Sequence, residues 1–211
     1  MEFNLQPVLN RLQTRLIRIL LMALIILLLL PWIRLPFYVV PADAAAVVKV
    51  FGRPLPVPVG PGFHLKVPID GIMSVRVIPV KQILREEFGF RTTREGSPDQ
   101  PATYTPHPEE AKMLTGDENI AYVEWTVQYR ISDPIQYDIN ISNPRQTLRK
   151  AAEAAMRKVV GESSLDTVIT EGRAEIEARV KDELQAVLDR YPAGISIVTV
   201  QLQQALAPEP V

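Results

Sequence analysis

The chain lacks several residue types and patterns that common chemistries need. It has no cysteine among its 211 residues, which excludes disulfides, thiolate nucleophiles and cysteine-ligated zinc. It has two histidines, His64 and His107, and neither lies at metal-ligand spacing from a second histidine. We therefore expect structural or solvated histidines, and no metal or other cofactor.

A large excess of charge of one sign is also missing. The formal net charge is −1, although residues 1–41 carry four arginines against Glu2, a local charge of +3 that leaves −4 for the remainder. Because the larger part of the chain is not basic, we do not expect it to bind nucleic acid.

The sequence contains no catalytic arrangement that its spacing would reveal. A Gly-x-Ser-x-Gly elbow and a glycine-rich phosphate loop are both absent. The adjacent carboxylates Asp117 and Glu118 lie side by side on a predicted turn, whereas a general acid and base must converge across a cleft. We interpret them as turn-forming residues or as part of an interface. No catalytic residue is expected, and the protein is predicted not to be an enzyme.

What the sequence does contain is a long apolar segment near its N-terminus. The fifteen residues from Ile19 to Ile33 carry no charge. At 1.5 Å per residue they cover about 22 Å of a hydrocarbon layer of roughly 30 Å, so flanking residues must help to span it. We predict a transmembrane helix from near Pro7 to Leu30. The anchoring residues are apolar or aromatic and comprise Ile19, Leu20, Leu24, Leu28 and Trp32.

The charges around this segment predict its orientation. Three arginines precede it and Arg34 follows it closely, which favours a cytoplasmic N-terminus. We therefore expect a single-pass protein of the inner membrane, in contact with membrane lipid, with residues 1–41 as anchor and the rest in the periplasm.

A cleaved signal peptide is the alternative, with Ala42 to Ala44 as an Ala-x-Ala site that would release a secreted binding module. Trp32, Arg34 and three prolines lie between Leu30, where the predicted helix ends, and that site. This spacing favours the uncleaved anchor.

The exported part divides into two predicted units of an α+β fold. Residues 42–115 are proline-rich and form a β-rich unit with short strands at 44–51, 63–67 and 72–80 and an exposed loop at 91–112. Residues 116–207 form a unit of strand, helices and strand. Its first strand, 121–131, alternates apolar and polar residues, with Trp125 and Tyr129 on the buried face.

Three helices and a final strand follow in this second unit. Asn143 and Pro144 open a helix that Gly161 can end. Ser163 and Asp166 suit a capping box for a short helix reaching about residue 170. The third helix has a buried stripe at helical spacing, composed of Ile176, Val180, Leu184, Val187, Leu188 and Tyr191. Residues 195–203 return to strand character.

Arg173 lies at the start of that third helix, where the helix dipole disfavours a cation. This mismatch predicts a salt bridge from Arg173 to a neighbouring element or to another subunit. We favour pairing within the chain, and we retain Arg173, with Asp117 and Glu118, as a candidate interface residue.

Seven segments together carry a family resemblance. They are VVKVFGR (47–53), PGFHLKVP (61–68), MLTGDENI (113–120), VQYRISDP (127–134), AAEAAMRKVVG (151–161), TEGR (170–173) and GISIVTVQLQ (194–203). In this order, behind an N-terminal apolar helix, they resemble the SPFH or Band 7 family, which includes stomatins, prohibitins and flotillins. The resemblance is closest to the bacterial HflK branch of that family.

The resemblance implies a membrane-anchored scaffold rather than an enzyme. Such a protein would assemble with an HflC-like paralogue into a large hetero- or homo-oligomer that surrounds a membrane-bound FtsH-like AAA protease and restrains its access to substrates. Because family members often act together with proteases, a membrane-tethered hydrolase is the alternative. No residue spacing in the sequence supports it.

The sequence departs from the family pattern in two places. Three alanines, Ala44 to Ala46, stand where family members usually carry Glu and Gly before the first strand. The family also continues into a long heptad-bearing helix, whereas these 211 residues end at Val211 and contain no coiled coil. The sequence is therefore either a truncated chain or a protein that assembles poorly, and we favour truncation.

Overall fold

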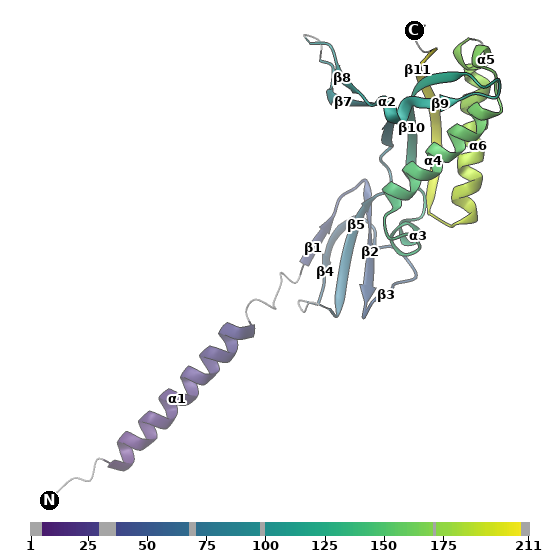
Figure 1. Ribbon diagram of the computed structural model, residues 1–211. Helices are drawn as coiled ribbons and strands as arrows, with labels where there is room; N and C mark the ends of the chain where they lie inside the picture. Colours follow the sequence, from purple (N-terminus) through teal and green to yellow (C-terminus); the bar gives the residue numbers. More distant parts are fainter. Residues whose placement is uncertain (1–5, 30–36, 68–70, 98–99, 171, 208–211) are drawn as a thin grey trace, which may run out of the picture.

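The computed structural model describes residues 6–29, 37–67, 71–97, 100–170 and 172–207. An N-terminal helix, α1, precedes a body built around two main sheets (Figure 1). The elements are α1 (Gln6–Leu29), β1 (Phe37–Val40), β2 (Ala44–Val50), β3 (Arg53–Pro54), β4 (Gly62–Leu65), β5 (Met73–Pro79), β6 (Leu84–Phe88), β7 (Phe90–Arg94), β8 (Thr103–Pro106), α2 (Pro108–Ala111), β9 (Lys112–Leu114), β10 (Ile120–Ile131), α3 (Pro134–Ile139), α4 (Pro144–Gly161), α5 (Leu165–Ile169), α6 (Arg173–Arg190) and β11 (Ile195–Leu206).

Helix α1 covers the predicted apolar segment. Its bounds agree with the predicted helix to within one residue at each end. Ile19, Leu20 and Leu24 have exposed side chains, whereas Trp32 and the side chain of Leu28 lie outside the described part of the chain. Among the described residues, no helix combines the length and apolarity that crossing a membrane requires. The transmembrane role of α1 stays a prediction.

The first sheet holds only the first part of the segment 42–115 that the sequence predicts as one β-rich unit, because β6 and β9 pair with β10 in the second sheet. Strands β3, β2 and β5 form an antiparallel sheet in that order, and β1 pairs with β4 in a two-stranded sheet beside it. Residues 37–40, which the sequence analysis placed with the anchor, form β1. A small core of Val40, Ala44 and Ala46 holds these strands together.

The second sheet is centred on β10. Its order is β11, β10, β6, and β9 also pairs with β10. Trp125 and Tyr129 are 0% and 3% exposed, which confirms the buried face that the period-two pattern predicts. Helices α4 and α6 cover one face of this sheet (Figure 1) and share its hydrophobic core. The mixed α+β prediction is therefore confirmed.

The exposed excursion that the sequence predicts at 91–112 contains regular secondary structure. Strands β7 and β8 pair as a hairpin that projects from the body (Figure 1), and α2 and β9 follow it. Gly89 adopts a φ of 81° between β6 and β7, and a Cβ there would lie 3.0 Å from the Cβ of Ala111. The sequence shows no sign of the hairpin because its threonines are polar and show no alternation. They are β-branched, however, which suits a strand. All four residues of β8 are nevertheless exposed.

Two helix details also differ from the sequence predictions. Asn143 caps α4 as predicted, but the cap of α5 is Ser164, whose hydroxyl accepts from the Thr167 N–H at 3.3 Å. The Ser163 hydroxyl instead donates to the carbonyl of Val159, so the predicted capping box is displaced by one residue. Tyr191 is 66% exposed because α6 ends at Arg190 before the stripe is complete.

The two sheets meet around α3, which the sequence analysis did not predict. Asp133 caps this helix by accepting from the backbone N–H groups of Ile135 and Gln136. The Asp138 carboxylate then forms salt bridges with Lys49 of β2 at 2.7 Å and Arg76 of β5 at 2.6 Å. A single helix of the second unit is thereby tied to two strands of the first.

Candidate functional site

The predicted acidic pair lies on an exposed turn between β9 and β10. Asp117 accepts hydrogen bonds from the Thr115 hydroxyl at 2.5 Å and from the backbone N–H of Leu165 at 3.1 Å. The Thr115 hydrogen bond, supported by the Leu165 bond, lowers the pKa of Asp117 below its ordinary value. Glu118 occupies the left-handed region with a φ of 61°. The turn role is confirmed, while the interface role stays a prediction.

Arg173 begins α6 but has no salt bridge within the described residues. Its Nε is buried and has no hydrogen-bond partner in that part of the chain, and the nearby Glu171 lies outside it. The predicted intramolecular pairing is therefore not among the described contacts. No described contact joins Arg173 to Asp117 or Glu118 either, so the structure does not assemble these three residues into one site.

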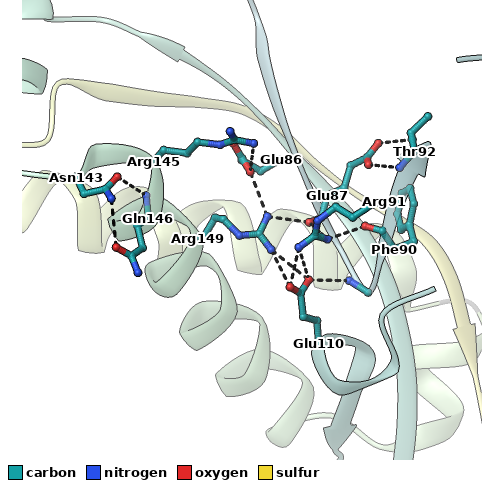
Figure 2. Close-up of polar contacts among 11 residues, drawn as sticks. Glu86, Glu87, Phe90, Arg91, Thr92, Glu110, Asn143, Arg145, Gln146 and Arg149 are labelled. Carbon is teal, nitrogen blue, oxygen red and sulfur yellow. Dashed lines mark hydrogen bonds and ion pairs between the residues drawn. The ribbon is translucent and has the colours of Figure 1, made fainter. Parts of the chain in front are cut away.

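A charged network that the sequence analysis missed connects β6, β7, α2 and α4 (Figure 2). Glu86 of β6 is 3% exposed. Its carboxylate accepts hydrogen bonds from Arg145 and, at 3.1 Å, from Arg149 of α4. Arg149 also donates to Glu110, which accepts a 2.6 Å bond from Arg91. We call these five residues the arginine–glutamate network.

The network rests directly on the aromatic core of the second sheet. The guanidinium carbon of Arg149 lies 4.5 Å from the ring centroid of Phe88, a cation–π geometry. Phe88 in turn stacks on Trp125 with ring centroids 4.0 Å apart. The packed rings hold Arg149 between the two carboxylates, so its position is set by the core as well as by charge.

The electrostatics favour the charged forms of Glu110 and Arg145. Burial alone would raise the pKa of Glu110, but the hydrogen bond and charge of Arg91, together with the charge of Arg149, outweigh it and lower that pKa. The hydrogen bond and charge of Glu86 raise the pKa of Arg145. Every member thus has an opposite charge beside it, which suits binding or positioning rather than proton transfer.

A surface hollow of about 450 Å³ opens beside the network. Helix α4 supplies one wall and the β7–β8 hairpin supplies the other. The lining residues are Arg85, Glu86, Glu87, Arg91, Thr92, Glu95, Gly96, Ala102, Tyr104, Arg145 and Arg149. Within the described residues no group of histidine or carboxylate side chains could hold a metal ion. The paired charges that line the hollow could contact a charged partner.

One signal in the sequence could have led to this network. Arg145 and Arg149 lie four residues apart in the first turns of α4, whose first turn contains no acidic residue. Two cations there are disfavoured by the helix dipole and repel each other. Arg173 at the start of α6 is disfavoured by the dipole in the same way. Such a pair requires carboxylates from elsewhere in the chain, and the adjacent Glu86 and Glu87 were available.

The fold agrees with comparison to known proteins. The family model described as SPFH domain / Band 7 family matches residues 38–210. The chain belongs to the SPFH/Band 7 family. The arginine–glutamate network and the hairpin both lie inside the matched SPFH region.

Similar curated proteins are named HflK. Protein HflK of Borreliella burgdorferi is 30% identical over 209 residues, which cover 98% of this chain and 63% of that protein. Protein HflK of Treponema pallidum is 35% identical over 153 residues, 72% of this chain and 45% of that protein. The Escherichia coli relative is named modulator of FtsH protease HflK. It is 39% identical over 99 residues, which cover 47% of this chain and 24% of that protein. This SPFH chain thus spans less than two thirds of the length of these relatives.

Proposed function

We propose that this SPFH protein is a membrane-anchored, non-enzymatic scaffold of the HflK type. It assembles with an HflC-like paralogue and modulates a membrane-bound FtsH-like AAA protease. The observation that carries the proposal is membership of the SPFH/Band 7 family together with a relative that is named a modulator of FtsH protease. The hydrolase and secreted-module alternatives have no comparable observation in their favour.

An apolar face on the β1–β4 pair supports the membrane location. Phe37 lies opposite Leu65, and Val39 lies opposite Phe63, so all four side chains share one face of the β1–β4 pair. Their exposed fractions run from 42% to 73%, and Phe37 stacks on Phe63 at 5.4 Å. Exposed apolar side chains gathered in this way favour contact with a membrane or with another protein.

The same face suggests how the protein is oriented. It lies in the first strand after the α1 segment and in that strand's partner. We infer that α1 anchors the chain with its N-terminus in the cytoplasm and that the β1–β4 face rests on the periplasmic side of the inner membrane. The second sheet then points away from the lipid.

Purification of the tagged protein from its own membranes in mild detergent tests this function. We expect it to co-purify with an HflC-like paralogue and an FtsH-like protease, and we expect its deletion to change the degradation rate of a membrane substrate of that protease. A Phe63→Ser variant should reduce labelling of the β1–β4 pair by a photoactivatable lipid probe, whereas Phe51→Ser, which changes an exposed phenylalanine outside that pair, serves as the control. A monomer that cross-links to neither partner would contradict the proposal.

A further inference from the structure

A smaller hollow lies between the β7–β8 hairpin and the two long strands of the second sheet. Its volume is about 230 Å³, and its lining residues are Phe90 and Tyr104 of the hairpin, Glu124 of β10, and Gln203 and Gln204 of β11. This volume is below the range of about 300–1,000 Å³ that is usual for small-molecule sites. The hollow therefore suits a single side chain rather than a whole metabolite. We call it the Glu124 pocket.

Two features of the backbone shape the Glu124 pocket. The register of the β10–β11 ladder shifts directly after Glu124, and the shift leaves Gln203 as an extra residue next to Gln204. This bulge interrupts the alternation of β11, so both glutamines are exposed, and bulges often re-aim side chains at functional sites. On the other side, Gly89 lets the hairpin pass close to β10, because a Cβ there would lie 3.2 Å from Cγ of Glu124.

The carboxylate of Glu124 has no countercharge within the described residues. Burial raises the pKa of the Glu124 carboxyl, and no neighbouring cation acts to lower it. Three other glutamates near the hairpin, Glu86, Glu87 and Glu110, each have an arginine beside them. A half-buried carboxylate that lacks such a partner favours the approach of a cation.

Two aromatic rings add a second means of recognising a cation. Phe90 and Tyr104 meet edge to face, with ring centroids 5.7 Å apart and planes at 79°. Phe90 is 5% exposed and Tyr104 is 57% exposed, so a buried ring supports an accessible one. The face of an aromatic ring attracts a cation that lies within about 6 Å of its centroid. A carboxylate and a ring face in one pocket therefore select a cation over a neutral group.

We propose that the Glu124 pocket binds the basic side chain, lysine or arginine, of a partner polypeptide. The cation lies beside the Glu124 carboxylate and against the Tyr104 ring, and the amide oxygens of Gln203 and Gln204 accept its remaining N–H groups. The hairpin that forms one wall lies well away from β1 and β4 (Figure 1), which carry the proposed membrane face. This separation favours a polypeptide over a lipid headgroup. The inference goes beyond the proposed scaffold function and does not depend on it.

An NMR titration of the isotope-labelled full chain in detergent micelles tests this proposal. The probes are the blocked tripeptides glycine–lysine–glycine and glycine–arginine–glycine, the neutral glycine–glutamine–glycine, and phosphoethanolamine as a lipid headgroup. We expect the basic peptides to cause saturable shifts of the Gly89, Glu124 and Gln204 amide signals at neutral pH. We expect the glutamine peptide and phosphoethanolamine to bind at least fivefold more weakly than either basic peptide.

Matched variants separate the Glu124 pocket from general attraction of cations to the protein surface. Glu124→Gln and Tyr104→Leu should each weaken binding of the lysine peptide at least fivefold. Glu109→Gln removes an exposed carboxylate of α2 outside the pocket, and Tyr191→Leu changes a tyrosine that is 66% exposed and also lies outside it. Both controls should bind the lysine peptide as the natural chain does.

The contrary results are equally specific. Equal affinity for the basic and glutamine peptides, or no saturable shift with either basic peptide, would overturn the proposal on the natural chain alone, whether or not the variants fold. Unchanged binding in a folded Glu124→Gln variant would overturn it too, because the cation would then lie elsewhere. Stronger binding of phosphoethanolamine than of the basic peptides would assign the pocket to a lipid headgroup and refute the polypeptide partner. The scaffold function is tested separately by co-purification.

Discussion

Glu86 carries its charge in the protein interior, where an unpaired charge would destabilise the fold. Transfer of a carboxylate into a protein interior costs several kcal/mol unless donors replace its water. Here Arg145 and Arg149 supply those donors from one helix. Arg149 also donates to the carbonyl of Glu87 at 2.9 Å, so the pairing fixes α4 against the strand that carries both glutamates.

Replacing Glu86 by glutamine tests this role. Glu86→Gln keeps the side-chain shape but removes the charge that two guanidinium groups share, so we expect the free energy of unfolding to fall by about 1–3 kcal/mol. Glu95→Gln, at the exposed rim of the hollow, should change it by less than about 0.5 kcal/mol. Urea unfolding followed by far-ultraviolet circular dichroism measures both. Equal losses in the two variants would show that Glu86 has no special pairing role.

Helix α6 protects the outer edge of the second sheet. Three of its side chains, spaced four residues apart, bond the backbone of β11: Glu177 accepts from the N–H of Leu202, Lys181 donates to the carbonyl of Val198, and Gln185 accepts from the N–H of Ile197. Residues at this spacing lie on one helix face. A bare edge strand invites pairing with another chain, and this ladder blocks that pairing along part of β11.

Removal of the ladder should expose that edge. In a Glu177→Ala, Lys181→Ala, Gln185→Ala variant, we expect the Ile197 and Leu202 amides to exchange with solvent about fivefold faster, because each loses a hydrogen bond worth about 1 kcal/mol. Hydrogen exchange measured by mass spectrometry or NMR tests this. Asp182→Ala, at an exposed position on the same helix, is the control, and unchanged exchange in the triple variant would refute the protective role.

The molecule as a whole depends on a clamp between its two sheets. Asp138 has a side chain that is 1% exposed and lies between Lys49 and Arg76. Val47, Ile78 and Ile131 form a small hydrophobic core across the same junction. The β1–β4 pair beside the first sheet carries the proposed membrane face, so this clamp fixes the second sheet relative to that face.

The clamp should make stability depend on pH in acid. Burial alone would raise the pKa of Asp138, but the hydrogen bonds and charges of Lys49 and Arg76 outweigh it and lower that pKa. A lowered carboxyl pKa stabilises the fold above the unfolded value of about 3.9, and this stability is lost as pH falls through the folded pKa. We expect Asp138→Asn to lower the free energy of unfolding by about 1–3 kcal/mol at pH 7.

Urea titrations at pH 7 and below pH 4 provide the measurement. The difference between the natural chain and Asp138→Asn should shrink as the pH falls below about 4. Asp182→Asn, which changes an exposed carboxyl group, should show little effect at either pH. A difference that stays constant into acid would mean that the charge of Asp138 does not hold the clamp.

Sequence patterns predicted those elements that are determined by interactions between residues close together in the chain. The alternation in β10 and the Asn143 cap of α4 both follow from neighbouring residues, and the structure contains both. The hairpin of β7 and β8 was missed because its polar threonines show no hydrophobic period. The network was missed for a different reason: Glu86 and Arg145 are 59 residues apart in sequence, so no local spacing relates them.

By itself, the sequence determined family membership, the buried face of β10, most of the buried stripe of α6 and the exclusion of cysteine chemistry, because motifs and periodicity are properties of short stretches of chain. Only the tertiary structure decided which charges meet. It placed Glu86 beneath Arg145 and Asp138 between Lys49 and Arg76. It also placed the turn of residues 116–119 beside Ser163, where α4 ends. Those relations depend on how strands from distant segments pair and how helices pack on them, which local patterns do not specify.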